Sequence, residues 1–503
     1  MAKTEFKGRH AELKLLDDLW QSPNATLLIL YGRRRVGKPR LRTHWRGRHA
    51  DQAIYWVAEP TSALDQLRSF SQALFNFNQP DVPAPLEFSY ATWEQALQQA
   101  AALAKEKRLA LFIDEVTYLL DVHPSFPGTL QKMWDHQLSK TNLILALSGS
   151  QMGMMQNLLA YEAPLYGRAA AQIKLPPLPF DVTPEFFPDY DAGERVKVYA
   201  AFGGIPAYWE RLDQAMPVMD NLRDQLLTSN TLMQEEPRLL LQDFINDPHN
   251  YVAIMRAIAH GAQTQHLIAK RTGLSSGHVS KYLSVLRDTG FVERQVPVTE
   301  NAATSRRGRY FVTDPYLRFY YRFLSAYQAQ LALGEQQQAM KVIEQYLPEF
   351  IEANTWQELC REWLLRASAH EEMPLQVEDV GGAWKRSTTF DVVGISRGNN
   401  HLVLGSSQWN RKPADLSAVQ HLVEKTSAIV PKSGTWDVYY VGFAAGGWTG
   451  EARALAEELT RNGSAKHWKA AGIRLLDLEE VDADLTRWAR ELDEERIGLA
   501  SLL

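Results

Sequence analysis

Short apolar runs alternate with longer amphipathic stretches over the first third of the chain. The apolar runs lie at 26–31, 53–57, 109–113, 143–148 and 171–175. Each run has the length of a strand, and the stretches between them carry apolar residues at helical spacing. Such alternation is typical of a mostly parallel sheet covered by helices. We therefore predict an α/β core over residues 1–178, which ends where the proline-rich segment 175–180 breaks the pattern.

The pattern becomes largely helical after this core. Residues 179–248 carry helical spacing interrupted by the turn-forming segment 203–206, and we predict a small helical lid. Residues 249–315 show three helical patterns followed by two short strand patterns, near 291–298 and 309–312. That order predicts a winged helix-turn-helix.

A second α/β unit is predicted at the end of the chain. Residues 316–345 form an aromatic-rich helical linker, and residues 346–503 return to mixed patterning. A helical pattern there is followed by apolar runs of strand length at 389–395, 401–404 and 436–442. The fold class is therefore α/β with several domains, and 503 residues are too many for one ordinary core.

A glycine-rich basic loop directly follows the first predicted strand. It nearly completes the phosphate-loop pattern G-x-x-x-x-G-K-S/T. In such a loop, backbone N–H groups surround phosphate oxygens and the lysine reaches the outer phosphates. The sequence thus predicts an ATP site of the P-loop NTPase kind, with a plain basic turn as the alternative. Its candidate residues are Gly32, Arg33, Arg34, Arg35, Val36, Gly37, Lys38, Pro39 and Arg40.

Pro39 is the departure from that pattern. It stands where a serine or threonine hydroxyl binds Mg²⁺, and proline supplies neither a hydroxyl nor an N–H. Proline is sterically acceptable in the first turn of a helix, so the loop can still fold. We therefore expect nucleotide binding to survive more easily than hydrolysis.

Polar residues end the third and fourth predicted strands. After the third strand, Asp114 is expected to hold the Mg²⁺ shell and Glu115 to polarise the attacking water. After the fourth, Ser148 and Ser150 are expected to sense the terminal phosphate or orient water, with an ordinary strand-end turn as the alternative. Arg168, just before the fifth strand, is expected to reach a neighbouring subunit's phosphate, unless it is a surface arginine.

These pieces together resemble the archaeal-type ATPases, a branch of the signal-transducing AAA-like NTPases. The resemblance rests on the segments FKGRHAEL, YGRRRVGK, IDEVTYLL, SGSQM, PLYGR and FGGIPAYWE. It implies a helical lid, a winged helix and a C-terminal domain similar to restriction endonucleases. It also implies that Phe6, Gly8 and Arg9 border the adenine. In this family a threonine normally follows the lysine, so Pro39 puts Mg²⁺-dependent hydrolysis in question.

The last helical pattern of the predicted winged helix-turn-helix carries polar residues on its outward side. Val279, Leu283 and Leu286 are at core-facing positions. The outward residues His278, Lys281 and Arg287 suit the major groove of double-stranded DNA. Near the predicted wing, Arg306, Arg307 and Arg309 are candidates for phosphate contacts. The alternatives are a protein-contact module and a solvated arginine loop.

The C-terminal unit has lost most of a nuclease metal site. Nucleases of the restriction type place two acids and a lysine on adjacent strands. Asp391 matches the first acid, but the next strand ends in Ser406, Ser407 and Gln408. Glu358 is either a remnant of the site or a solvated helical glutamate. We predict a nuclease-like domain without catalytic activity.

Composition sets the remaining limits. A net charge of −5 restricts any DNA contact to a local patch, and the single cysteine, Cys360, excludes an internal disulfide framework. The N-terminus lacks the apolar segment of a signal peptide, and no uninterrupted apolar run is long enough to cross a membrane. We expect a cytoplasmic protein without membrane contact.

These features favour a nucleotide-dependent switch that binds ATP and Mg²⁺ and contacts DNA through the winged helix. A homo-oligomer, through Arg168, or a protein partner is a further expectation. The alternative is a DNA-binding regulator whose ATPase core is a relic. An active nuclease is the least favoured function, because its motif has lost more of the required residues than the other motifs have.

Overall fold

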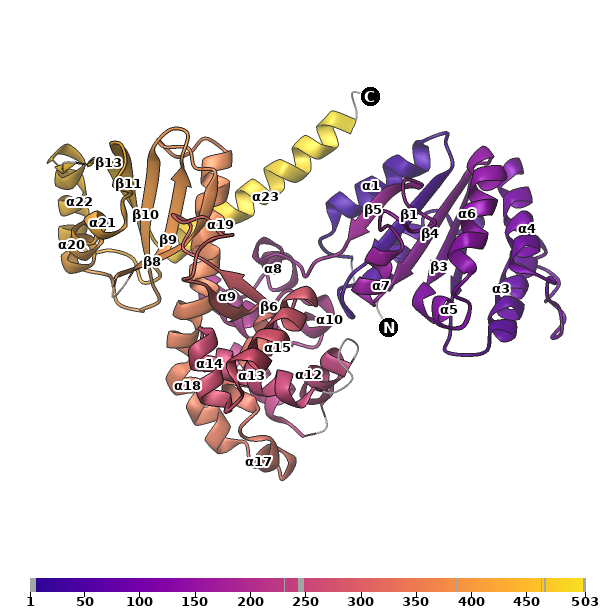
Figure 1. Ribbon diagram of the computed structural model, residues 1–503, viewed down its shortest axis with the longest axis horizontal. Coiled ribbons are helices and arrows are strands. Elements are labelled where there is room, and N and C mark those ends of the chain that lie inside the picture. The colour runs from indigo at the N-terminus through magenta and orange to yellow at the C-terminus, as the bar shows by residue number, and fades with distance from the viewer. Residues whose placement is uncertain are drawn as a thin grey trace. The chain divides into compact units, whose positions relative to one another are not determined.

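The computed structural model describes residues 6–229, 231–242, 248–385, 388–462, 464–465 and 467–500. The chain divides into two compact units (Figure 1). The first contains the chain up to Leu178, together with Ile205–Ala207 and the segment from Asp493. The second contains Pro179–Gly204 and Tyr208–Leu492. Each unit has its own sheet and is described separately.

The first unit is built on a parallel five-stranded sheet. Its strands follow the order β2-β3-β4-β1-β5. They are β1 (Thr26–Tyr31), β2 (Ala53–Val57), β3 (Leu109–Asp114), β4 (Leu143–Gly149) and β5 (Ala169–Lys174). All five predicted strands are confirmed, and their ends differ from the predictions by at most two residues.

Helices cover both faces of this sheet, which is why the central strands are buried along their whole length. On one face Trp56 of β2 packs edge-on against Phe70 of α3, and on the other Trp45 of α2 packs edge-on against Phe112 of β3. The helices are α1 (His10–Gln21), α2 (Lys38–Arg46), α3 (Ala63–Asn78), α4 (Trp93–Glu106), α5 (Val116–Val122), α6 (Phe126–His136) and α7 (Met152–Asn157) (Figure 1).

The order of the strands places the candidate residues. In a parallel sheet all carboxyl ends lie at one edge, and ligands bind outside that edge. β1 and β3 both neighbour β4, so the loop after β1, the acidic pair after β3 and the serines after β4 meet there. The fold therefore brings together residues that are far apart in the sequence.

The lid region consists of short helices rather than long ones. They are α8 (Thr183–Phe186), α9 (Ala192–Phe202), α10 (Pro206–Trp209), α11 (Val218–Leu222) and α12 (Leu232–Gln242). α9 ends because Gly203 adopts a φ of 61°, and the indole N–H of Trp209 donates to the Gly203 carbonyl. Residues 243–247 of the predicted lid lie outside the described residues.

The predicted winged helix is confirmed. It contains α13 (His249–Ala259), α14 (Gln265–Thr272), α15 (Ser276–Asp288), β6 (Val292–Gln295) and β7 (Arg309–Val312), and its two strands pair antiparallel. Ser275 caps α15 by accepting from the His278 N–H, and the predicted inward residues Val279, Leu283 and Leu286 are buried. The helices α16 (Pro315–Phe319), α17 (Gln328–Ala332), α18 (Gln337–Ile351) and α19 (Gln357–Ala369) follow.

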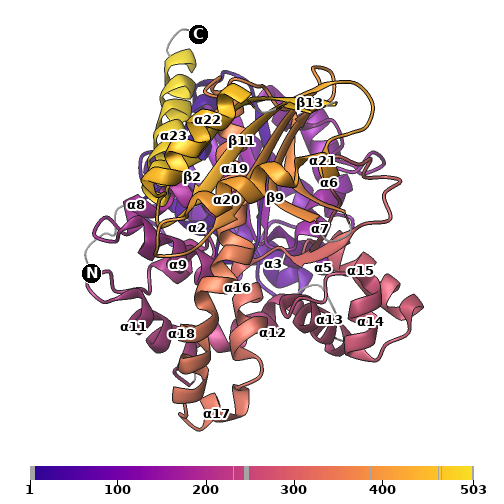
Figure 2. The ribbon, with the colours of Figure 1, turned by 90° about the vertical axis from the view of Figure 1, so that its left-hand side faces the viewer.

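The last part of the second unit is a mixed six-stranded sheet, in the order β12-β13-β11-β10-β9-β8. Its strands are β8 (Asp379–Lys385), β9 (Thr388–Ser396), β10 (His401–Gln408), β11 (Trp436–Ala444), β12 (Ser464–Ala465) and β13 (Trp468–Leu476). The helices packed with it are α19, α20 (Leu416–Glu424), α21 (Thr426–Ile429), α22 (Gly450–Asn462) and α23 (Leu478–Ala500) (Figure 2). The three predicted strands are β9, β10 and β11, whereas β8, β12 and β13 were not predicted.

Candidate nucleotide site and winged-helix surface

The loop between β1 and α2 has the geometry of a tight phosphate loop. A side chain on Gly32 would meet the Leu175 carbonyl oxygen at 2.5 Å, so the end of β5 leaves room only for glycine. Gly37 precedes α2 with a φ of 97°, which a residue with a side chain rarely adopts. Both glycines are therefore required by the backbone, as the motif predicts.

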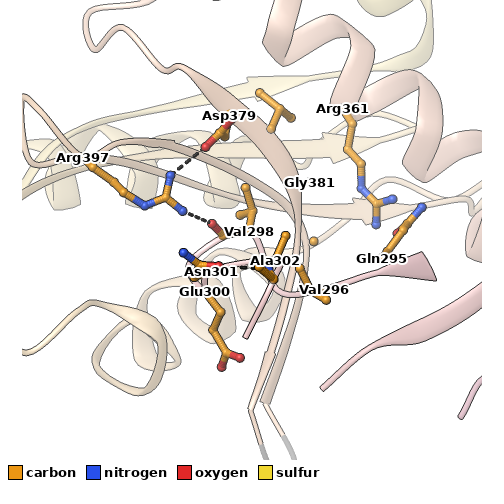
Figure 3. A pocket seen from close by; sticks show the side chains of 13 residues that line it. Gln295, Val296, Val298, Glu300, Asn301, Ala302, Arg361, Asp379, Gly381 and Arg397 are labelled. Carbon is orange, nitrogen blue, oxygen red and sulfur yellow. Dashed lines mark hydrogen bonds and ion pairs between the residues drawn. The ribbon is translucent and has the colours of Figure 1, made fainter. Parts of the chain in front are cut away.

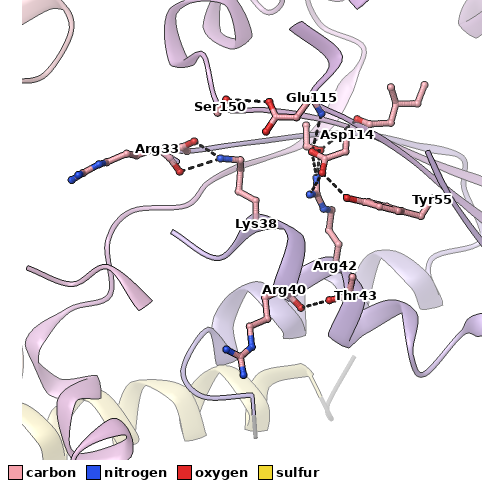
Figure 4. Close-up of polar contacts among 12 residues, drawn as sticks. Arg33, Lys38, Arg40, Arg42, Thr43, Tyr55, Asp114, Glu115 and Ser150 are labelled. Atoms are coloured by element: carbon pink, nitrogen blue, oxygen red, sulfur yellow. Dashed lines mark hydrogen bonds and ion pairs between the residues drawn. The ribbon is translucent and has the colours of Figure 1, made fainter. Parts of the chain in front are cut away.

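Lys38 is buried at the first position of α2, and its ammonium group points back into the loop. Its Nζ donates to the carbonyl oxygens of Gly32, at 2.6 Å, and Arg33, at 3.0 Å (Figure 4). Burial lowers the pKa of Lys38 to about 8, although the nearby Glu115 carboxylate acts in the opposite direction. The lysine is thus held where phosphate oxygens would replace the loop carbonyls as acceptors.

Pro39 occupies the first turn of α2, where its missing N–H interrupts no helical hydrogen bond. The ring is exposed. Arg40 extends away from Lys38 in Figure 4, and its backbone carbonyl accepts from the Thr43 hydroxyl at 3.1 Å. Neither residue offers an oxygen ligand to a cation beside Lys38.

The Asp114 carboxylate at the end of β3 is bound by Arg42. Arg42 Nη1 donates to Oδ1 at 2.7 Å and Nη2 donates to Oδ2, in a bidentate pair whose side chains are only 1% and 4% exposed. The Tyr55 hydroxyl also donates to Oδ2 at 2.6 Å (Figure 4). Burial alone raises the pKa of Asp114, but the charge of Arg42 and these hydrogen bonds lower it overall.

Ser148 and Ser150 each contact one of the two acids. The Ser148 hydroxyl donates to Asp114 Oδ1 at 2.8 Å and accepts from Arg42, so it belongs to the buried ion pair. The Ser150 hydroxyl donates to Glu115 Oε2 at 3.0 Å. Glu115 itself has a φ of 46°, a left-handed conformation that is unusual for a residue with a side chain. The two serines therefore differ in their partners: Ser148 contacts the buried Arg42–Asp114 pair, and Ser150 contacts Glu115.

A magnesium ion does not fit the donors at this edge. Mg²⁺ needs near-octahedral oxygen ligands, supplied in such sites by one or two carboxylates and the substrate phosphates. Here Pro39 has no hydroxyl, and both oxygens of Asp114 already accept hydrogen bonds from Arg42. The sequence-based expectation that Asp114 holds the Mg²⁺ shell did not anticipate this arginine.

The residues expected to border the adenine lie beside the loop. The Phe6 ring stacks on the His44 ring of α2, with centroids 4.4 Å apart. Gly8 and Arg9 have φ values of 67° and 62°, and the Arg9 guanidinium donates to the carbonyl oxygens of Val36, at 3.1 Å, and Pro176, at 2.5 Å. This segment is thereby fixed to the back of the phosphate loop.

Arg168 is held within its own unit. Its Nε and Nη2 each donate to Asp135 at 2.8 Å, and Nη1 donates to the Pro164 and Tyr166 carbonyl oxygens. For the guanidinium to reach a neighbouring subunit's phosphate, this ion pair has to break.

Comparison with known proteins shows which family descriptions match the segments that form this site. Residues 6–212 match the family described as an ATPase domain predominantly from Archaea. This match begins at Phe6 and contains the phosphate loop, the acidic pair, both serines and Arg168. Residues 6–212 are therefore an ATPase domain of the archaeal type. Residues 250–296 match the IclR helix-turn-helix domain, and residues 320–420 match a family of archaeal and bacterial proteins of unknown function.

The individual proteins that are similar to this chain share only a small part of its sequence. An uncharacterized protein of Methanocaldococcus jannaschii is 26% identical over 429 residues, which cover 84% of this chain and 92% of the relative. The Walker-type ATPase of Pyrococcus abyssi is 18% identical and covers 64% of this chain and 97% of its own, with a TM-score of 0.48. The ORC2 protein of Aeropyrum pernix, solved as ADPNP and ADP complexes, is 12% identical and covers 67% and 96%, with a TM-score of 0.40.

The winged helix presents a polar face. His278, Lys281 and Arg287 of α15 are all exposed, whereas the opposite side of the helix is buried. That arrangement leaves the predicted recognition residues accessible to a groove. Within the described residues, no helix combines the length and apolarity that a bilayer crossing requires.

The three arginines of the wing have different surroundings. Arg306 is exposed, Arg307 forms an ion pair with Glu300, and the Arg309 guanidinium lies 4.5 Å from the centre of the Trp384 ring. All three line an open cavity of about 550 Å³, together with Arg294. Arg306 is thus the one most readily offered to a phosphate.

The segment after β6 pairs with the edge strand of the C-terminal sheet. The Val298 N–H donates to the Gly382 carbonyl at 2.9 Å, and Arg397 donates to the Val298 carbonyl and to Asp379 (Figure 3). A cavity of about 860 Å³ lies beside this junction, and Arg361 and Gln295 lie along one side of it (Figure 3). The wing and the C-terminal sheet therefore share hydrogen bonds.

Asp391 has few of the partners that a nuclease site requires. The Ser407 hydroxyl donates to Asp391 Oδ2 at 3.4 Å, and Arg361 contacts only the Asp391 carbonyl, at 2.7 Å. Burial raises the pKa of Asp391 despite the charge of Arg361. Glu358 forms a 2.7 Å ion pair with Arg318, and its side chain is 42% exposed.

Two residues of the nucleotide site escaped the sequence reasoning. Arg42 follows Lys38 by four residues, a helical spacing that places both side chains on one face and was available as a signal. Tyr55 lies in an apolar strand, where a phenol hydroxyl needs a buried partner. Its partner is Asp114, so both missed residues converge on the same carboxylate.

Proposed function

We propose that this protein is an ATP-binding switch whose hydrolytic capacity is low, and that nucleotide occupancy alters DNA contact through the winged helix. In this proposal residues 1–178 form the nucleotide-binding core, 179–248 the lid, 249–315 the DNA-contacting module and 316–345 the linker. Residues 346–503 are a nuclease-like domain without catalytic activity.

One observation carries the proposal: the loop from Gly32 to Lys38 holds the lysine ammonium against its own carbonyl oxygens. A basic surface turn has no reason to bury a lysine with two carbonyl acceptors, because desolvating an ammonium group is costly. A phosphate loop does, since phosphate oxygens take the place of those acceptors. The match of residues 6–212 to an ATPase family supports the same function.

We expect weak hydrolysis because the site lacks protein ligands for a cation. ATP hydrolysis by P-loop proteins depends on a cation that neutralises charge developing on the phosphates. Pro39 and the Arg42–Asp114 pair remove the ligands for that cation, while Glu115, beside Ser150, keeps the position expected of a water-polarising acid. We therefore expect binding to be measurable and turnover to be slow or absent.

The test is a titration of the full chain with fluorescent ATP, using Lys38→Ala and the matched control Lys132→Ala, which removes an exposed lysine from the same unit. Loss of a charge-assisted contact of about 1.5–3 kcal/mol weakens binding by about 10- to 100-fold in Lys38→Ala. The control binds as the native chain does. No binding by the native chain, or equal binding by Lys38→Ala, overturns the proposal.

A second candidate function is a DNA-binding regulator whose ATPase core is a relic. The exposed residues His278, Lys281 and Arg287 on α15 favour it, since they need no nucleotide to meet a major groove. It is distinguished by duplex DNA affinity that is the same with and without ATP. The switch requires that the two affinities differ.

DNA binding itself is tested by its dependence on salt. If Lys281 contacts a phosphate, Lys281→Ala reduces the slope of log affinity against log salt by about 0.9. Lys341→Ala, which removes an exposed lysine from α18, leaves the slope unchanged. A slope in Lys281→Ala equal to that of the native chain means that Lys281 contacts no phosphate. No measurable affinity of the native chain for DNA assigns the winged helix to protein contact.

A further inference from the structure

We infer that this site binds its nucleotide without magnesium, with the Arg42 guanidinium permanently occupying the carboxylate that would otherwise hold the metal. The inference rests on the proposed nucleotide binding and specifies its ligand as a metal-free nucleoside polyphosphate. It follows from the contacts of Asp114, the chemistry of Pro39 and the position of Arg42 relative to Lys38.

The hydrogen-bonding capacity of Asp114 is fully used. A carboxylate offers about four lone-pair sites. Oδ1 accepts from Arg42 Nη1, the Ser148 hydroxyl and the Glu115 N–H, and Oδ2 accepts from Arg42 Nη2 and the Tyr55 hydroxyl. Five donors thus meet one carboxylate, and a metal ligand bond would have to displace at least one of them.

Displacing Arg42 is unfavourable because the arginine is interior. It lies on α2 with its side chain 1% exposed, its guanidinium also donates to Ser148, and its plane lies 5.4 Å from the Tyr55 ring centre. A guanidinium separated from Asp114 here would remain a buried charge without its counter-ion, which is strongly destabilising. The ion pair therefore resists opening for a metal.

Pro39 removes the second protein ligand at the same place. In a complete phosphate loop the hydroxyl after the lysine and the strand-ending acid hold Mg²⁺ together. Pro39 has no hydroxyl, and it follows Lys38 on the same helix that carries Arg42. Two residues of α2 therefore remove both protein ligands of the metal, because Pro39 lacks the hydroxyl and Arg42 occupies the Asp114 carboxylate. Both residues favour a site without the metal.

The charge near the loop is suited to a polyphosphate without its metal. Lys38 and Arg42 are four residues apart on one helical face, and Arg33, Arg34 and Arg35 belong to the loop itself. A divalent cation placed beside Lys38 would be repelled by its ammonium group. Free ATP, which carries more negative charge than its magnesium complex, matches this positive surrounding better.

The experiment is a calorimetric titration of the full native chain with ATP, once in EDTA and once in excess MgCl₂. We expect the affinity in EDTA to equal or exceed that in Mg²⁺. An affinity at least about tenfold higher in Mg²⁺ overturns the inference and leaves the proposed function standing. Absence of binding in both conditions overturns the proposed function itself, so the two failures are distinguishable.

A designed variant provides the matched comparison. Pro39→Thr restores the hydroxyl but keeps Arg42, and we expect its ATP affinity to stay independent of Mg²⁺. Pro39→Thr with Arg42→Leu restores both ligands, and we expect its affinity to rise at least about tenfold with Mg²⁺. If Pro39→Thr alone becomes Mg²⁺-dependent to the same degree, Arg42 does not substitute for the metal and the inference is wrong.

A second readout does not require the double variant to fold. Manganese is a spectroscopic substitute for Mg²⁺, and its electron paramagnetic resonance signal reports free metal. When native protein is added to a mixture of ATP and Mn²⁺, we expect free Mn²⁺ to increase because the protein removes metal-free ATP from the complex. A decrease in free Mn²⁺ shows that the site retains the metal and overturns the inference.

Discussion

Asp114 in the first unit and Asp391 in the second each match an acid of a metal-binding motif in the sequence. Asp114 ends β3 and Asp391 lies within β9, and each has an arginine near it. The two acids differ in how the neighbouring arginine contacts them. The guanidinium of Arg42 meets the Asp114 carboxylate directly, whereas the guanidinium of Arg361 reaches only the Asp391 backbone carbonyl.

This difference reverses the effect of burial on the two carboxyl groups. Burial by itself raises the pKa of both. At Asp114 the charge of Arg42 and three sets of hydrogen bonds outweigh burial, and the pKa falls below its usual value. At Asp391 burial prevails and the pKa is raised. Two buried strand acids can therefore be unsuited to a metal ion for different reasons: one is paired with an internal cation, and the other resists ionisation.

Removing the charge of Asp114 tests the first half of this comparison and has the largest expected effect. Asp114→Asn leaves Arg42 buried without a counter-ion, so the free energy of unfolding of the first unit falls by about 3–5 kcal/mol. The measurement is denaturant unfolding followed by tryptophan fluorescence at neutral pH.

The control for this variant is Asp135→Asn, which breaks a bidentate but more exposed ion pair with Arg168 in the same unit. We expect it to cost much less than Asp114→Asn, because an exposed ion pair contributes little to stability. Equal effects of the two substitutions would mean that the buried pair is no more important to the fold than a surface pair, and the comparison would fail.

The pH dependence of ATP affinity tests whether the protonated ammonium group of Lys38 contributes to phosphate binding beside the Arg42–Asp114 pair. Burial lowers the pKa of Lys38 to about 8, and phosphate binding requires the protonated form. ATP affinity is therefore constant below pH 8 and falls above it, by about tenfold or about 1.4 kcal/mol between pH 7 and pH 9. Titrations at several pH values measure this directly.

Lys38→Arg is the matched variant for that profile, because a guanidinium stays charged throughout this range. Its ATP affinity, whatever its absolute value, is expected to vary little between pH 7 and pH 9. A native profile that remains flat to pH 9 would show that Lys38 is not the titrating group.

The parallel core and the phosphate loop were predictable because their signals are local. Apolar runs of strand length are bounded by turns, and Gly32 and Gly37 satisfy backbone requirements that no other residue meets. In the second unit, β9, β10 and β11 were likewise readable as apolar runs. By contrast β8 contains Gly381 and Gly382 at a sheet edge, where it pairs with the segment at Val298, and its pattern does not identify it as a strand.

The ion pair between Arg42 and Asp114 was not predictable from a local signal of this kind. It depends on a contact across 72 residues between α2 and β3, which a reading of successive motifs does not connect. The i+4 spacing of Lys38 and Arg42 indicates only that the two side chains share a face. The carboxylate that Arg42 reaches is determined by the strand order, in which β4 separates β1 from β3.

Asp391→Asn tests the second half of the comparison and has the smallest expected effect. Because the folded-state pKa of Asp391 is raised, ionising it costs free energy that accumulates as pH rises from the ordinary aspartate pKa through the raised one. Asparagine removes this cost at neutral pH but weakens the interaction with Ser407, so the free energy of unfolding changes by less than about 1 kcal/mol. The native chain loses its small disadvantage as the pH is lowered, and the difference between the two proteins shrinks accordingly. A loss comparable to that of Asp114→Asn would show that Asp391 is a charged partner of Arg361 after all, and the two carboxylates would then be paired with a cation in the same way.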